Sequence, residues 1–444
     1  MKKFLALLLT LVLCLGLMAG CGGSKDSGTT GTDNTSTEDT GSTATGSVYY
    51  LNFKPEADQA WQDLAKLYTE QTGVEVKVVT AASGEYNTTL TAEMGKSEAP
   101  TLFQCGNAQA LLDWGDYCMD LSGTKVLDEM TTSDFNLVED GATKAIGYCY
   151  EAFGIIVNKA LLKEAGYELS DITNFETLKA VAEDIHARSG ELGFDAFSSS
   201  GLDGSSSWRF SGHLANMPLF YEFRDDGVTE QPAEITGAYL DNYRAIWDLY
   251  IDNASASKSS LTTATGDMSS GEFKEGKAVF YQNGTWEYAG LIDAGLKAED
   301  LAMIPIYCGV DGEENAGLCC GTENCWAVNA KSSEADIQAT LDFMYWVVTS
   351  DEGTKMMAEQ FGPIPFKNAK ESENVFFNDA NAYMADGKYT VTWAFNYTPN
   401  VDSWRATVVS ALAAYSADQS DANWDAVKTA FVDGWAYEYG VQNG

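Results

Sequence analysis

Short apolar segments typical of β-strands alternate with segments of helical periodicity from residue 48 onward. A strand is expected at residues 48–52, and apolar residues at helical spacing follow it up to Thr72. A second strand is expected at residues 74–79, with a helix at residues 86–94 after it. This alternation favours an α/β fold with a largely parallel sheet. In open sheets of this kind ligands bind beyond the carboxyl ends of the strands, so residues directly after strands are the candidates for a site.

The same alternation continues along the rest of the chain. Thr173 and Glu176 have the spacing of a capping box at the start of a helix. Further strands are expected at residues 100–103, 154–157, 301–305 and 325–328, and further helices at residues 108–114, 175–188, 335–348 and 422–439.

The first 21 residues have the pattern of an export signal. Lys2 and Lys3 precede an uncharged, Leu-rich run at residues 4–20, which is typical of a secretory signal peptide. The run is barely long enough to span a membrane, so a retained anchor helix is the alternative. The sequence Leu-Met-Ala-Gly before Cys21 resembles the bacterial lipobox. The resemblance implies that a signal peptidase removes residues 1–20 and that Cys21 carries a diacylglyceryl group.

The segment after the lipobox is polar and of low complexity. Residues 21–47 consist largely of Gly, Ser, Thr and Asp, and almost none of them can be buried in a core. Such a composition predicts a flexible tether between the lipidated Cys21 and a folded body at residues 48–444. The body is therefore expected outside the cytoplasm, attached to the cell membrane by lipid.

The charge of the chain excludes several kinds of partner. The sequence has 27 Lys and Arg against 65 Asp and Glu, a formal net charge of −38. A chain this acidic repels phosphate backbones and anionic lipid headgroups, so we expect no nucleic acid partner and no polybasic membrane patch. Hydrophobic residues make up 45% of the sequence, which is enough for large buried cores.

The cysteines do not form the pattern of a disulfide scaffold or a metal site. Apart from Cys14 and Cys21, the cysteines are Cys105, Cys118, Cys149, Cys308, Cys319, Cys320 and Cys325. Their number is odd and no C-x-x-C motif occurs, so buried free thiols are favoured, with one disulfide as the alternative. His186 and His213 are far in sequence from the cluster around Cys320, so no metal site is expected there.

Four stretches of the chain, taken together, resemble the extracellular solute-binding proteins of ABC importers. They are the strand, loop and helix of residues 48–79, the segment Glu-Ala-Phe-Gly-Ile-Ile-Val-Asn-Lys at residues 151–159, the segment from Phe273 to Trp286, and residues 303–354. The resemblance is to the carbohydrate-binding group of that family, which includes maltose-binding protein. The four stretches occur in the order of the family and extend over almost all of residues 48–444.

The resemblance implies two α/β lobes joined by a hinge that the chain crosses three times. The crossings are expected near residues 152–155, near residues 300–304 and near Ser350. The implied division is residues 48–153 and 303–349 for the amino-terminal lobe, and residues 154–302 and 350–444 for the carboxy-terminal lobe. A ligand would bind in the cleft, and the lobes would close over it by hinge bending for recognition by a membrane permease.

Several tryptophans are candidates for stacking against a sugar. Sugars are bound by aromatic faces and by planar polar side chains. Trp286 follows Asn283 and Gly284, where the family places a stacking Trp, and Trp208 lies in a polar loop. Trp393 and Trp404 flank a segment late in the chain where the family supplies another stacking Trp. Trp404 fits that place better, and core packing is the alternative for both. The tryptophans on apolar stripes or strands are assigned to the core: Trp61, Trp247, Trp326, Trp346 and Trp424.

Polar candidates follow the predicted strands. The resemblance suggests Glu151 as a carboxylate for sugar hydroxyls, because maltose-binding protein has a Glu at that place. Arg209 could donate to sugar hydroxyls or neutralise neighbouring acids. The remaining polar candidates are Asn52, Lys54 and Glu56 after the first strand, Gly106 and Asn107 after the third, and Asn283 beside Trp286.

The function expected from these observations is binding without chemistry. The chain would be a monomeric, lipid-anchored receptor that captures a mono- or oligosaccharide, needs no cofactor or metal, and delivers the sugar to an ABC permease. One alternative is a different polar solute, such as a polyamine or a metal chelate, which an acidic cleft around Glu151 would suit. The other is a surface enzyme that degrades glycans, but motifs of hydrolases such as Gly-x-Ser-x-Gly and His-Glu-x-x-His are missing from the sequence.

Overall fold

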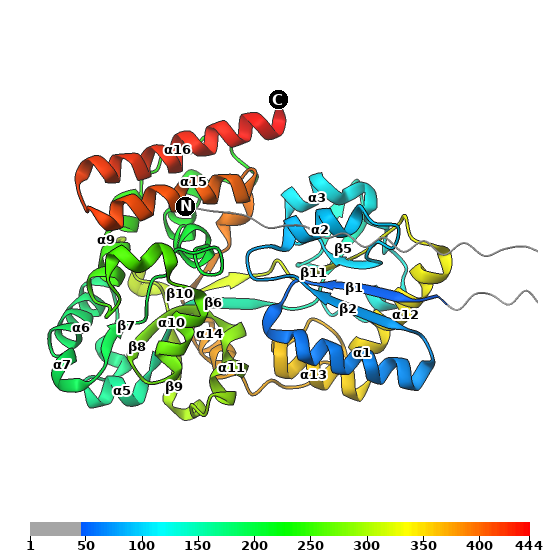
Figure 1. Cartoon of the computed structure of the whole chain (residues 1–444), viewed down its shortest axis with the longest axis horizontal. Coiled ribbons are helices and arrows are strands. Elements are labelled where there is room, and N and C mark those ends of the chain that lie inside the picture. The colour runs from blue at the N-terminus through cyan, green and yellow to red at the C-terminus, as the bar shows by residue number, and fades with distance from the viewer. Residues whose placement is uncertain (1–45) are drawn as a thin grey trace, which may run out of the picture. The chain divides into compact units, whose positions relative to one another are not determined.

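The computed structural model describes residues 46–444 and contains two mixed β-sheets (Figure 1). The predicted signal peptide, the lipid site Cys21 and nearly all of the predicted tether lie outside the described residues. The strands are β1 (Val48–Asn52), β2 (Val76–Thr80), β3 (Leu102–Gln104), β4 (Leu137–Glu139), β5 (Ala142–Gly147), β6 (Glu151–Asn158), β7 (Asp195–Phe197), β8 (Ala278–Gly284), β9 (Leu301–Ile304), β10 (Ala316–Gly321), β11 (Cys325–Val328) and β12 (Tyr389–Thr392).

The helices lie between the strands and at the end of the chain. They are α1 (Asp58–Thr72), α2 (Tyr86–Met94), α3 (Ala108–Trp114), α4 (Lys125–Asp128), α5 (Lys159–Glu164), α6 (Phe175–Ala187), α7 (Ser189–Leu192), α8 (Asn216–Asp226), α9 (Leu240–Asp252), α10 (Gly266–Lys274), α11 (Tyr288–Asp293), α12 (Glu334–Thr349), α13 (Asp351–Phe361), α14 (Val375–Ala385), α15 (Val401–Ala417) and α16 (Asp421–Asn443). Among these described helices, none combines the length and apolarity required to cross a membrane.

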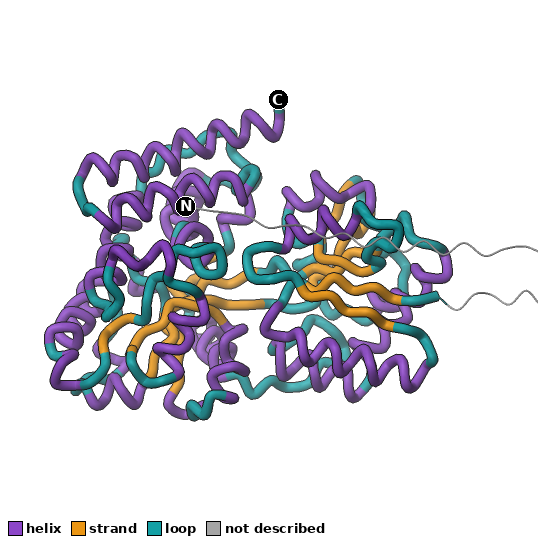
Figure 2. Tube along the Cα trace, in the orientation of Figure 1, coloured by secondary structure: helices purple, strands orange, loops and turns teal. Residues whose placement is uncertain are grey.

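The first sheet has the strand order β2-β1-β3-β11-β5-β4. β1 pairs in parallel with β2 and β3, whereas β11 runs antiparallel to both β3 and β5. Alternate side chains of its strands enter two different cores. Tyr50 and Leu102 pack with helices α1, α12 and α13, whereas Leu51 and Phe103 pack on the other face with α2. Helices therefore cover both faces of this sheet (Figure 2).

The second sheet has the order β12-β10-β6-β8-β7, and β9 also pairs with β6. β6 runs antiparallel to β10, β8 and β9, so the expectation of a largely parallel sheet is wrong. Its residues also alternate between cores. Phe153 and Ile155 pack in the core that contains α6, α8, α9, α15 and α16, whereas Ala152 and Ile156 pack in a core with α14.

The chain passes between the sheets at places that differ in part from those expected. The first passage, from the first sheet to the second, lies between Gly147 and Glu151. The second passage, on which the chain returns to the first sheet, lies between Gly321 and Cys325. Residues 303–321 therefore belong to the second sheet, whereas the sequence analysis expected them in the amino-terminal lobe. The pattern of residues 301–305 indicated a strand but not its partner, which is β6.

The third passage follows α13 rather than α12. Ser350 ends α12, and its hydroxyl accepts a hydrogen bond from the backbone N–H of Gly353, which caps α13. The resemblance placed a crossing near Ser350, but the chain there turns between two helices that pack in the same core. Phe366 still packs in the core of the first sheet, and Phe376 packs in a core of the second.

Several local predictions can be compared with the structure. β1, α2, α3 and β11 have the predicted bounds. The cap of α6 is Asn174 rather than Thr173, and its side chain accepts from the backbone N–H of Thr177 at 3.0 Å. All seven cysteines in the described part of the chain are buried free thiols.

Candidate functional site

The turn after β1 directs Lys54 toward the second sheet. The side-chain nitrogen of Asn52, the last residue of β1, donates to the backbone carbonyl oxygen of Lys54 at 2.7 Å. The side-chain oxygen Oδ1 of Asn52 accepts from the backbone N–H of Lys54 at 3.0 Å. Asn52 also donates to the hydroxyl of Thr80. These bonds occupy the amide of Asn52, so this predicted site residue shapes the turn that holds Lys54.

Lys54 forms a buried ion pair with Glu151. The Lys54 Nζ atom lies 2.7 Å from one carboxylate oxygen of Glu151, and the other oxygen accepts from Asn324 at 2.7 Å. Glu56 lies at 3.6 Å from the same ammonium group. Burial alone would lower the pKa of Lys54. The carboxylates of Glu151 and Glu56 outweigh this effect, so the pKa of Lys54 lies above its ordinary value. Glu151 lies at the end of the first passage and Asn324 lies near the end of the second, so their hydrogen bond joins the two passages.

Aromatic side chains from the part of the protein that is built around the second sheet lie beside this ion pair. The ring of His213 is stacked on Phe153, with centroids 4.1 Å apart and an angle of 6° between the planes. Trp208 and Trp286 lie 5.0 and 5.3 Å from His213 and 6.0 Å from one another. The Lys54 Nζ atom lies 5.1 Å from the Trp286 ring centroid, within the range of a cation–π interaction. We call these four rings the aromatic cluster.

His213 is buried in the aromatic cluster in its neutral form. Burial lowers its pKa well below the ordinary value, and the charges of Arg405 and Lys54 lower it further. Its Nδ1 atom has no hydrogen-bond partner among the described residues. Arg405 lies on α15, and its Nε atom donates to Ser211 at 3.4 Å. The aromatic cluster therefore contains one ring nitrogen with unused hydrogen-bonding capacity within the described residues.

Gly284 explains the position of the Trp286 ring. A Cβ atom at Gly284 would lie 2.2 Å from atoms of that ring, closer than any real contact. The indole of Trp286 therefore lies directly on the backbone at the end of β8. This contact is the structural reason for a glycine two residues before the tryptophan.

Asn107 and Glu323 form a second polar contact. Asn107 caps α3 by accepting from the Ala110 N–H at 2.9 Å, and it donates to the Glu323 carboxylate at 3.0 Å. A Cβ atom at Gly106 would lie 2.1 Å from the Glu323 carbonyl oxygen, so only glycine permits this approach. Burial raises the pKa of Glu323. The loop after β3 is thus packed against the second passage.

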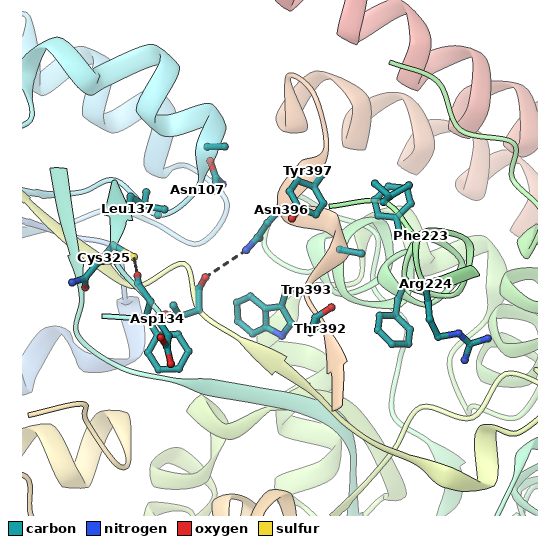
Figure 3. A pocket seen from close by; sticks show the side chains of 18 residues that line it. Asn107, Asp134, Leu137, Phe223, Arg224, Cys325, Thr392, Trp393, Asn396 and Tyr397 are labelled. Atoms are coloured by element: carbon teal, nitrogen blue, oxygen red, sulfur yellow. Dashed lines mark hydrogen bonds between the residues drawn. The ribbon is translucent and has the colours of Figure 1, made fainter. Parts of the chain in front are cut away.

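A cavity of about 580 Å³ adjoins this region (Figure 3). Residues that pack with both sheets line it. They are residues 106–108 and 134–137, Phe220, Phe223, Arg224, Val228, Thr322, Cys325, Thr392, Trp393, Ala394, Asn396 and Tyr397. Gly106, Asn107 and Trp393 are the predicted site residues that line it.

Three other predicted residues are held by contacts within the protein. Arg209 is 2% exposed and donates to the hydroxyls of Ser206 and Ser269 and to the carbonyls of Ser199 and Gln282. Asn283 is 1% exposed and donates to Tyr281 and Glu287. Trp404 is fully buried and donates to the carbonyl oxygen of Phe431. The residues that the sequence analysis did not propose are Phe153, His213, Glu323, Asn324, Asn396 and Arg405.

A sequence signal existed for two of the residues that were missed. Glu323 and Asn324 lie two and three positions after the end of β10, and residues after strands are expected at a ligand site. β10 itself was not predicted, because its sequence Ala-Gly-Leu-Cys-Cys-Gly is rich in small residues. Within residues 46–444, no group of three or more His, Cys, Asp or Glu is arranged to hold a metal ion.

The fold is similar to that of solved sugar-binding proteins. The protein RafE in complex with raffinose superposes with a TM-score of 0.67 at 15% identity, over 87% of this chain and 98% of that chain. A structure from a study of xylan utilisation by Caldanaerobius polysaccharolyticus gives a TM-score of 0.66 at 18% identity, over 86% of this chain and 98% of that one. The bacterial solute receptor AcbH, described as preferring β-D-galactopyranose, gives 0.67 at 12% identity, over 89% and 100%.

The sequence itself identifies the family. A comparison with curated protein sequences finds no match. Residues 63–385, which are well over half of the chain, match the family described as bacterial extracellular solute-binding protein. Together with the two-sheet fold, this match shows that the chain belongs to the bacterial extracellular solute-binding proteins.

Proposed function

We propose that this protein captures a sugar between its two sheets and delivers it to the permease of an ABC importer. The observation that carries the proposal is the aromatic cluster beside the Lys54–Glu151 ion pair. Aromatic faces can pack against the C–H surface of a sugar ring, and the charged and amide groups next to them can bind its hydroxyls. The direct candidates for ligand contact are Lys54, Glu56, Asn107, Glu151, Trp208, Trp286 and Trp393.

Each sheet with its helices would form one lobe, and the three passages would form the hinge. The ligand would hold the lobes closed, since a ligand favours the state in which it makes more contacts. Glu151 and Asn324 lie at two of the passages and bond to one another. Their contact with Lys54 would couple the occupied cleft to the hinge.

The amino-terminal sequence supports attachment to a membrane. Residues 1–20 would be removed as a lipoprotein signal, Cys21 would carry the lipid, and residues 22–47 would act as the tether. An extracellular family fits this location. A lipid anchor would keep the receptor close to its permease, and we propose that it acts as a monomer.

The charges in the region favour a neutral sugar over a polyamine. Glu56, Glu151 and Glu323 are acidic, but Lys54 and Arg405 supply positive charge among them. A protonated polyamine would have to approach these two cations and could not accept hydrogen bonds from them. RafE, a structure similar to this chain, was solved with the neutral sugar raffinose.

A thermal-shift screen of the purified protein tests the proposal. The panel contains raffinose, xylo-oligosaccharides, chitin oligosaccharides, their monosaccharides, spermidine and divalent cations. A ligand that binds the folded state raises Tm by mass action, so one class of sugar should raise it and be recovered intact. A response only to spermidine or a cation, or recovery of a cleaved glycan, would refute the proposal.

Two variants locate the site within that screen. Trp286→Ala should abolish or strongly reduce the shift caused by the sugar. Trp346→Ala is the matched control, because Trp346 packs partly buried on α12 against the core of the first sheet. It should lower Tm without ligand and leave the ligand-induced shift intact.

A further inference from the structure

Asn400, the residue directly before α15, has an unusual backbone conformation. Its φ and ψ angles are 38° and 53°, in the left-handed region that residues other than glycine adopt rarely. Such a conformation persists where surrounding contacts hold it, and ligand sites are among the places where it occurs. Asn400 follows the cavity-lining residues Trp393 and Tyr397 in the same segment of chain (Figure 3). Contacts that hold Asn400 therefore also hold one wall of the cavity.

The contacts that hold Asn400 come from the last two turns of α16, which packs beside α15 (Figure 1). The side-chain nitrogen of Asn400 donates to the carboxylate of Glu438 at 3.0 Å and to the backbone carbonyl oxygen of Glu438 at 3.2 Å. The backbone N–H of Asn400 donates to the side-chain oxygen of Gln442 at 3.2 Å. Glu438 and Gln442 are four positions apart, so they lie on the same face of the helix. Together they bond both the side chain and the main chain of Asn400.

Gln442 also connects α16 to the cavity through a second amide. Its side-chain nitrogen donates to the side-chain oxygen of Gln231 at 3.0 Å. The side-chain nitrogen of Gln231 in turn donates to the backbone carbonyl oxygen of Tyr397 at 2.9 Å. The hydroxyl of Tyr397 donates to the carbonyl oxygen of Thr229 at 3.1 Å. A continuous series of hydrogen bonds therefore runs from Gln442 to Tyr397, which lines the cavity.

Trp435, on the same helix, supports a neighbouring wall of the cavity. Its ring lies 6.0 Å from that of Phe223 on α8, and its indole N–H donates to the carbonyl oxygen of Pro232 at 2.8 Å. The rings of Phe223 and Tyr397 are 6.1 Å apart, and both residues line the cavity. The end of α16 therefore contacts residues that form two neighbouring walls.

We infer that the end of α16 positions a wall of the ligand cavity, and that Asn400, Glu438 and Gln442 are positioning residues for ligand binding. None of these three lines the cavity, so they act through Tyr397 and the segment that also contains Trp393. A wall that is held in place before the ligand arrives reduces the loss of conformational entropy on binding. The inference rests on the proposed function, because the ligand concerned is the proposed sugar.

Calorimetric titration of a double variant, Glu438→Ala with Gln442→Ala, tests this role at a temperature well below Tm. The probes are raffinose, xylotriose, chitotriose and their constituent monosaccharides, and the one that binds the wild type most tightly is used for the comparison. The double variant should bind that sugar about fivefold more weakly, since ordering the wall then opposes binding. Tyr437→Ala is the matched control, because Tyr437 lies on the same helix and is 69% exposed. It should bind the sugar as the wild type does.

Two further measurements separate positioning from a general loss of stability. Asn400→Ala and Asn400→Gly both remove the side-chain bonds to Glu438, but glycine adopts the left-handed conformation without strain. Asn400→Ala should therefore bind the sugar more weakly than Asn400→Gly. Hydrogen exchange of the double variant without ligand, followed by mass spectrometry, should be faster than in the wild type at residues 393–400 and unchanged in β8.

The outcomes for the inference and for the proposed function can be distinguished. A double variant that is less stable but binds the sugar as tightly as the wild type would overturn the inference and leave the proposed function intact. Unchanged hydrogen exchange at residues 393–400 would do the same. Failure of every sugar to bind the wild-type protein would overturn the proposed function, and this inference with it.

Discussion

The ammonium group of Lys54 is surrounded by Glu151, Glu56 and the face of Trp286. Lys54→Met would leave the Glu151 carboxylate buried with only Asn324 as a partner. We expect the free energy of unfolding to fall by about 3–5 kcal/mol, since an unpaired buried charge is costly. Urea unfolding measures this loss. The double variant with Glu151→Gln should regain much of it, and a double variant as unstable as the single one would contradict the pairing.

The contact of Gly284 with Trp286 gives a second prediction. Gly284→Ala places a Cβ atom where the indole lies, so the ring must move. Sugar affinity should fall about tenfold, a loss of about 1.4 kcal/mol, although Trp286 itself is retained. Calorimetry with the sugar identified in the thermal screen measures the change. Gly190→Ala is the control, because a Cβ atom there meets nothing within 4 Å. Unchanged binding in Gly284→Ala would argue against Trp286 as a ligand contact.

Asp379 gives a prediction about pH. Burial raises its pKa to about 6, although the carboxylate accepts from the backbone N–H of Met303 at 2.8 Å. The folded state thus binds the proton more tightly than the unfolded state, and stability is lost as pH rises from about 4 to about 6. Asp379→Asn should therefore raise the free energy of unfolding at pH 8 by about 1–2 kcal/mol and change it little at pH 4.

Chemical denaturation at several pH values tests this. Asp386→Asn, at the exposed end of the same helix, should retain the wild-type dependence on pH. A stabilisation by Asp379→Asn that is the same at pH 4 and pH 8 would contradict the assignment.

At the scale of elements, local sequence patterns predicted the bounds of helices and strands better than they predicted how the strands pair. The apolar periodicity gives the bounds of α3 and β11, because both depend on neighbours in sequence. Strand direction could not be predicted in the same way. β6 has three antiparallel partners, which lie more than 100 positions later in the chain. The sequence of β6 itself does not indicate which strands these partners are.

The site shows the same limit. Trp208, Trp286 and Lys54 were predicted from turns and family position, and the structure brings them together. Arg209 and Trp404 also offer a cation and an indole, but their donors are bonded to other groups within the protein. Whether a polar or aromatic side chain has spare hydrogen-bonding capacity depends on tertiary contacts, which a single sequence does not contain.

Trp404 gives a prediction at this scale, because it packs α15 against α16. Its ring lies 4.7 Å from Phe431 and 5.9 Å from Trp435. Trp404→Ala should lower the free energy of unfolding by about 3–5 kcal/mol through the cavity it creates. Sugar affinity, measured well below Tm, should stay close to that of the wild type. A loss of affinity equal to that of Trp286→Ala would assign Trp404 to the site instead.

At the scale of the whole molecule, the chain passes between the two sheets three times. Two of these passages are joined by the hydrogen bond between Asn324 and Glu151. The proposed ligand would touch residues from both sides of these passages. The resemblance found in the sequence gave the family and the two-part architecture, which the family match and the fold confirm. It located the later passages less well, since β9 and β10 pair with β6 and β12 rather than with the first sheet.

A crystal structure of the protein with the sugar that raises Tm most is the most direct test of the account. It should show a sugar ring packed on Trp286, hydroxyls within hydrogen-bond distance of Lys54 or Glu151, and ligand contacts to residues of both sheets. A sugar bound to residues of one sheet alone, away from Trp286, would contradict it.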